Sequence, residues 1–205
     1  MKTLKHTQAG RRDFVFKVIP ACALSCMFGK EILGMNLETT ADEKHMFDRE
    51  FPIKMTFREY IERQNIIFIG FAKAVQKRYG KDAAIDVIKE WATEFNLERG
   101  SKQAQGSPDR SLKSYTRMFS NPKDWEGLLN MEIVEDSDDA FEMRVSECLI
   151  AVNFIEKDAS DIGYAGVCWG DYAWAEGFNP KIKLVRDKTL MQGHSCCNHR
   201  YVWTG

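Results

Sequence analysis

The stretch GYAGVCWGDYAWAEGFNP (residues 163–180) determines how the rest of this 205-residue chain is arranged. It carries few charges and predicts a largely buried helix that ends at Asn179-Pro180, because proline disfavours helical geometry in the preceding residue. Cys168 and Asp171 are three positions apart, so both side chains lie on one face of this helix. A neighbouring face carries only small residues and suits close approach of another element: Gly163, Gly166, Gly170, Ala173 and Gly177. A buried carboxylate must be paired, hydrogen-bonded or metal-bound, which makes Asp171 the first candidate for a functional residue.

After this helix the pattern predicts a strand over residues 182–190, a turn at Gly193 and a returning strand over residues 196–203. The period of two in the second strand divides its side chains between two faces. One face carries Cys197, His199, Tyr201 and Trp203, and the other carries Cys196, Asn198 and Arg200. Five residues with chemistry therefore fall within one supersecondary unit: Cys168, Asp171, His194, Cys197 and His199. The alternative is that the cysteines are merely small buried hydrophobes.

The remaining chain predicts an α+β fold, in which an N-terminal helical hairpin precedes an antiparallel sheet with packed helices. The helices of the hairpin cover residues 60–79 and about 84–95. The polar segment 98–111, with two glycines and a proline, predicts a mobile loop. Two strands follow at residues 131–134 and 141–145, and Cys148 opens an apolar helix over residues 149–155.

Composition limits the classes of function. Lys plus Arg number 29 and Asp plus Glu number 30, and this balance argues against nucleic acid as a partner. The length suits a single domain with one ordinary core. The six cysteines lack the paired C-x-x-C spacing of structural zinc sites.

The N-terminus carries a twin-arginine pattern, Arg11-Arg12, followed by the apolar run 18–28. It resembles a signal for the twin-arginine (Tat) export route. We therefore expect a signal over residues 1–29, a linker over 30–46 and one α+β domain over 47–205. The Tat export machinery would then be a partner, and the protein would reside in the periplasm or at the outer face of the membrane. The alternative is an amphipathic N-terminal helix of a cytoplasmic protein.

The C-terminal motifs resemble those of the bacterial L-2-amino-thiazoline-4-carboxylic acid hydrolase family, over about residues 47–203. The likeness rests on Cys148, Cys168-x-x-Asp171, Phe178-Asn179-Pro180 and the run KTLMQGHSCC at 188–197. Positions matching the family pattern are Cys148, Cys168, Asp171, Gly193, Cys197 and Arg200. His194 and Asn198 stand where many members have Asp, and His199 stands where they have Phe. The resemblance also implies kinship with small-ligand domains of the 4-vinyl reductase type.

What the resemblance implies is a hydrolase that opens a small cyclic amidine at a C–N bond, giving N-carbamoyl-cysteine from the thiazoline. Its expected catalytic residues are Cys148, Cys168, Asp171 and Cys197. Its expected substrate-binding residues are Lys188, Gln192, His194 and Arg200. Two routes stay open, a thiolate beside a base and water on a divalent metal such as zinc. The candidate metal ligands are Cys168, His194, Cys197 and His199.

Two other interpretations use the same residues. One is a non-catalytic exported module that binds a small ligand or a metal through the cysteine and histidine cluster. The other takes the cysteines as structural disulfides, which are permitted outside the cytoplasm.

Overall fold

The computed structural model describes residues 54–205, so the expected signal and linker lie outside the described residues. The helical hairpin predicted from the sequence is confirmed. Helix α3 (Phe57–Tyr79) begins at a capping box, in which Thr56 Oγ1 accepts from the Glu59 backbone N–H and the Glu59 carboxylate accepts from that of Thr56. It ends at Gly80, whose positive φ of 92° suits a residue without a Cβ atom.

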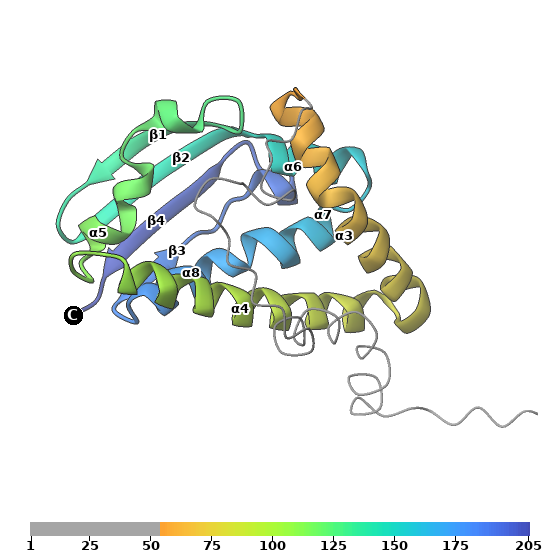
Figure 1. Cartoon of the computed structure of the whole chain (residues 1–205), viewed down its shortest axis with the longest axis horizontal. Helices are drawn as coiled ribbons and strands as arrows, with labels where there is room; N and C mark the ends of the chain where they lie inside the picture. Colours follow the sequence, from red (N-terminus) through yellow and green to blue (C-terminus); the bar gives the residue numbers. More distant parts are fainter. Residues whose placement is uncertain (1–53) are drawn as a thin grey trace, which may run out of the picture. The chain divides into compact units, whose positions relative to one another are not determined.

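Four antiparallel strands form one sheet in the order β1-β2-β4-β3 (Figure 1). Their bounds are Leu129–Asp136 (β1), Ala140–Cys148 (β2), Ile182–Val185 (β3) and Cys197–Trp203 (β4). With the helices packed on it, this sheet confirms the predicted α+β class.

The remaining helices lie before and between these strands in the chain. They are α4 (Lys81–Gln105), α5 (Leu112–Thr116), α6 (Leu149–Glu156), α7 (Ser160–Gly163) and α8 (Gly170–Phe178), with short 3-10 turns at Arg117–Phe119, Pro122–Trp125 and Leu190–Gln192. Helix α6 begins as predicted, because Cys148 is its N-cap and the Cys148 Sγ accepts from the Ala151 backbone N–H. Within the part of the chain that is described, no helix has the length and apolarity needed to cross a membrane.

The predicted loop over residues 98–111 is wrong in its first half, because α4 continues to Gln105. Gly100 lies where α4 crosses α8, and a Cβ atom there would overlap the Trp174 carbonyl oxygen. Gly177 meets the Leu97 backbone in the same way from the other side. The two helices therefore touch backbone to backbone, as the stripe of small residues on the C-terminal helix predicted. The glycine that indicated a loop is a packing residue.

The long helix predicted to begin at Gly163 is interrupted. Helix α7 ends at Gly163, a π-helical turn follows at Tyr164–Cys168, and α8 starts at Gly170. The turn is wider by one residue, since the Trp169 N–H donates to the Tyr164 carbonyl at 2.8 Å. The predicted strand over residues 182–190 is also shorter, because β3 ends at Val185.

The buried side chains form two clusters. One lies between the sheet, α5 and α8, and contains the aromatic residues Tyr115, Phe119, Phe141, Phe178 and Tyr201. The other lies among α3, α4, α6 and α7, with Phe154 and Ile162 fully buried. Cys148 and Leu190 pack against both clusters. The cysteine region therefore lies at the boundary between the two.

Candidate functional site

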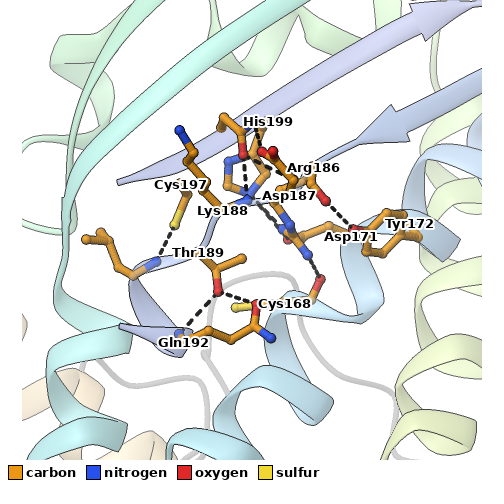
Figure 2. A network of polar contacts seen from close by, with 12 residues as sticks. Cys168, Asp171, Tyr172, Arg186, Asp187, Lys188, Thr189, Gln192, Cys197 and His199 are labelled. Carbon is orange, nitrogen blue, oxygen red and sulfur yellow. Dashed lines mark hydrogen bonds and ion pairs between the residues drawn. The ribbon is translucent and has the colours of Figure 1, made fainter. Parts of the chain in front are cut away.

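A buried arginine joins the start of α8 to the end of β3. Arg186 directly follows β3 and continues the inward alternation of Ile182 and Leu184, and only 1% of its side chain is exposed. Its Nη1 donates to Asp171 Oδ2 at 2.6 Å, and its Nη2 donates to the Cys168 carbonyl oxygen at 2.6 Å (Figure 2). The guanidinium group thus holds both residues of the Cys-x-x-Asp motif.

Asp171 lies in the first turn of α8, with 26% of its side chain exposed. Burial raises the pKa of this carboxyl group, while the hydrogen bond and charge of His199 and the cation of Arg186 lower it. The lowering effects are the larger, so the pKa lies below its ordinary value. Asp171 is therefore a carboxylate at neutral pH, which confirms that the charge in this helix is paired.

His199 on β4 completes the network. Its Nε2 lies 2.9 Å from Arg186 Nη1 and 3.5 Å from Asp171 Oδ2. Arginine has no acceptor, so the contact with Arg186 is a hydrogen bond in the tautomer that accepts at Nε2. In that tautomer Nδ1 carries the hydrogen.

Two N–H groups of this network are left over. His199 Nδ1 and Arg186 Nε are buried and have no hydrogen-bond partner within residues 54–205. Buried polar groups are normally satisfied, so these donors suit an acceptor supplied by a ligand or by water.

Three thiols surround this charge pair. Burial is the main cause that raises the pKa of Cys148, Cys168 and Cys197, and the negative charge of Asp171 raises each further. Cys197 Sγ also accepts from the Leu190 backbone N–H at 3.2 Å. The structure therefore brings the four predicted catalytic residues into one region, with the thiols protonated at neutral pH. All four cysteines of the described part, Cys196 included, are free thiols.

Of the four predicted substrate-binding residues, Arg200 faces away from this network, whereas Figure 2 shows Lys188 and Gln192 close to Cys168 and Cys197. Arg200 is on the face of β4 opposite His199, where its guanidinium group lies 2.9 Å from Glu135 and 3.7 Å from Glu142. The side chains of Lys188, Gln192 and His194 belong to exposed residues. Gln192 and His194 both contact Thr189 and close the turn that follows it. Their roles toward a substrate stay predictions.

The predicted metal ligands do not form a ligand set. Across residues 54–205, no three or more His, Cys, Asp or Glu side chains are arranged to hold a metal ion. His194 bonds to the Thr189 backbone, while His199 faces Arg186 and Asp171.

Arg186 is the functional residue that the sequence interpretation missed. The signal was present, because Ile182, Leu184 and Arg186 alternate with exposed residues and therefore share one strand face. A cation on the buried face of a strand needs a buried anion, and Asp171 was already the unpaired carboxylate of the neighbouring helix. The π-helical turn before Trp169 left no such mark, although such turns are frequent at functional sites.

A hollow of about 460 Å³ lies at the other end of β4. It is lined by Arg110, Ser111, Leu112, Asp138, Asp139, Asn179 and Trp203. Trp203 ends the strand that Cys197 begins, so this hollow is separate from the cysteine region.

The fold and the site define a small α+β domain in which an Asp–Arg–His network lies close to three thiols. The sequence profile of the L-2-amino-thiazoline-4-carboxylic acid hydrolase family matches residues 60–201, and the chain belongs to this family. The resemblance found in the sequence is thereby confirmed, and the family name points to hydrolase activity.

Two solved structures resemble the fold. One is a trafficking protein particle complex subunit 3 from Naegleria fowleri, covalently bound to palmitic acid. It is 10% identical, with a TM-score of 0.46, over 72% of this chain and 97% of that chain. The other is the phenol-responsive sensory domain of the transcription activator PoxR with phenol. It is 13% identical, with a TM-score of 0.40, over 76% and 78% of the two chains. Among curated proteins, none matches the sequence.

Proposed function

We propose that this protein hydrolyses a small cyclic amidine that bears a carboxylate, of the 2-amino-thiazoline-4-carboxylate kind, beside Asp171, Arg186 and His199. The observation that carries the proposal is the buried network itself, in which an ionised carboxylate adjoins two N–H donors without partners. Membership of the hydrolase family supports the same class of reaction.

The network matches the two charges of such a substrate. A protonated amidine is a planar cation with N–H donors, and an ionised Asp171 is its natural acceptor. The substrate carboxylate is an acceptor, and the open donors Arg186 Nε and His199 Nδ1 are suited to bind it. Binding would satisfy two buried N–H groups that are otherwise unpaired, which contributes to affinity.

The protonation states favour water over a thiolate as the nucleophile. A thiolate is the reactive form of cysteine, and the raised pKa of Cys168 leaves little of it at neutral pH. Water would add to the amidine carbon while Asp171 accepts one of its protons and passes it to the leaving ring atom. The thiols then serve as a poorly hydrated wall around the reacting carbon. A metal-activated water is the rival route, and loss of activity on dialysis against a chelator would identify it.

The bond that breaks is identified by the product. Loss of the ring sulfur from the hydrated carbon gives N-carbamoyl-cysteine with a free thiol, whereas loss of the ring nitrogen gives S-carbamoyl-cysteine with a free amine. The N-carbamoyl product therefore keeps both C–N bonds and requires C–S cleavage. C–N cleavage and formation of N-carbamoyl-cysteine therefore exclude each other. Titration of the free thiol and the free amine in the product shows which of the two occurs.

The test is turnover of L-2-amino-thiazoline-4-carboxylate by the purified full chain. We expect ring opening by the wild type and a loss of about 10²-fold or more in His199→Gln, as for removal of a group that positions a reacting carboxylate. The matched control is Arg200→Gln on the other face of β4, which should retain turnover. Ring opening that survives in His199→Gln would place the reaction elsewhere.

A non-catalytic binding module is the second candidate, and one observation favours it. The three thiols are protonated and Asp171 is neutralised by Arg186, so the resting site lacks a strong nucleophile and a strong base. Saturable binding of the thiazoline without any product over many hours would support this candidate against the hydrolase.

We also propose export through the Tat route, on the strength of Arg11-Arg12 and the apolar run that follows. Replacing both arginines with lysine should retain the protein in the cytoplasm. An unchanged distribution between cell fractions would support the cytoplasmic alternative.

A further inference from the structure

Helices α3 and α4 expose a continuous aromatic and aliphatic surface, which we call the aromatic face. It consists of Ile67, Phe68 and Phe71 on α3 and Val87, Trp91 and Phe95 on α4. Ile67 is 79% exposed, Phe71 65% and Phe95 51%. Exposed large side chains scattered singly are ordinary, but five exposed ones grouped around the half-buried Phe68 mark an interaction surface.

Ring contacts hold this surface in place. The Trp91 ring lies 5.7 Å from that of Phe68 and 5.6 Å from that of Phe95, between ring centroids. Phe68 in turn contacts Phe154, which is fully buried. Spacings of three and four residues connect Phe71 to Phe68 and to Ile67, and a spacing of four connects Val87 to Trp91. The aromatic face is therefore ordered by the core beneath it.

Opposite charges accompany the two halves of the aromatic face. On α4, an exposed acidic residue recurs every fourth position: Asp82, Asp86, Glu90, Glu94 and Glu98. Three of these immediately precede Val87, Trp91 and Phe95, so the acidic row runs along the apolar row. On α3, exposed Arg63 lies one turn before Ile67, and exposed Arg78 lies two turns after Phe71. The α3 half is therefore bounded by cations and the α4 half by anions.

We propose that the aromatic face binds a second copy of this chain in a two-fold symmetric dimer, with α3 of each copy against α4 of the other. A two-fold interface uses the same patch on both copies, so it must be self-complementary. The aromatic face is self-complementary in this sense. In the dimer, the arginines of each α3 would meet the acidic row of the other copy's α4, so the same contact would form twice. The acidic row argues against the anionic surface of a membrane, which attracts basic segments.

The oligomeric state tests the proposal directly. Sedimentation or light scattering of the full chain should give twice the 23.6 kDa chain mass at micromolar concentration. Trp91→Glu should give monomers with an unchanged circular dichroism spectrum, because the changed side chain is already half exposed. The matched control is Val134→Glu, at an exposed apolar residue of β1, which should stay dimeric. A wild type that is monomeric up to about 100 μM, well above the Kd of a specific interface, would overturn the proposal.

Charge reversal tests the stated pairing. Arg63→Glu with Arg78→Glu should weaken dimerisation at least tenfold, and so should Glu90→Lys with Glu94→Lys. All four changes together should restore the Kd to within about threefold, because the attractive pairs re-form with exchanged signs. Two equally weak double variants without rescue would overturn the α3–α4 arrangement. Flotation of the wild type with phosphatidylserine vesicles, lost in Trp91→Glu, would assign the surface to lipid and would likewise overturn it.

Discussion

Arg186 and Arg200 lie almost side by side at the junction of β3 and β4, since Arg200 pairs with Val185 in the ladder. Arg186 points into the core, where it holds Asp171 and the Cys168 carbonyl with 1% of its side chain exposed. Arg200 points the other way, with 39% exposed, and pairs with Glu135 beside water. The same residue type, one strand apart, thus makes one buried and one surface ion pair.

The difference shows that the face of the strand to which an arginine points decides whether its ion pair is buried or exposed. Neither the residue type nor its distance from the Cys-x-x-Asp motif decides this. A surface ion pair contributes about 0–1 kcal/mol, because water screens it and two side chains must be ordered. Breaking a buried pair costs about 3–5 kcal/mol, because it leaves an uncompensated charge without water. Four predictions follow this contrast from the largest effect to the smallest.

Asp171→Asn should have the largest effect. The change leaves the guanidinium group of Arg186 buried without its anion, and arginine cannot release its proton. We expect a loss of about 3–5 kcal/mol in the free energy of unfolding, together with loss of thiazoline turnover. Urea unfolding and turnover measured on one preparation check both. A variant as stable as the wild type would show that Arg186 has another partner in solution.

Arg186→Met should cost less than Asp171→Asn, although it removes the same pair. The stranded group is then a carboxylate that is 26% exposed and can take up a proton. We expect a loss of about 1–3 kcal/mol, the cost of leaving buried acceptors such as the Cys168 carbonyl unsatisfied. Urea midpoints of the two variants decide the order, and the reverse order would contradict the buried cation as the main cost.

The dependence of the unfolding free energy on pH should differ between variants of the two arginines. The pKa of Asp171 is below its ordinary value in the folded protein, so the unfolded chain takes up the proton first. Its stabilisation is complete above about pH 4 and is lost as the pH falls through the folded pKa. Arg200→Ala should keep this acid-dependent loss, whereas Arg186→Met should reduce it. Unfolding free energies between pH 7 and pH 2 test this, and equal slopes in both variants would contradict the assignment.

Arg200→Ala should have the smallest effect. Its pair with Glu135 is partly solvated, so we expect a change below about 1 kcal/mol in the free energy of unfolding. Turnover should match the wild type, because the side chain lies on the face of β4 away from His199. A large loss of turnover at full stability would restore Arg200 as a substrate-binding residue.

Much of the fold was predictable from local signals. Gly80 ended the first helix of the hairpin, and Cys148 opened α6 as its N-cap. The alternation along residues 197–203 placed Cys197 and Tyr201 on the buried face of β4. Each of these features depends on residues close together in the chain, which is why the sequence carries them.

The errors arose where distant segments decide the local structure. Gly100 and Pro108 in a polar segment indicated a loop, but the crossing with α8 requires a glycine inside α4. The Cys and Asp residues of the site were found through their motif. Arg186 was not found, because its partner Asp171 is fifteen residues away in the chain. The only signal for this pair is that Arg186 points to the buried face of its strand.

The π-helical turn at Tyr164–Cys168 has a consequence for how this gene can change. It contains one residue more than a regular helix needs, as a single inserted codon would leave behind. Deleting one codon there would give a more regular helix, yet it would rotate everything upstream by about 100° relative to Asp171. Gly163 would then lose its place against Phe154 and Met191. Selection on this segment should therefore tolerate hardly any change of length.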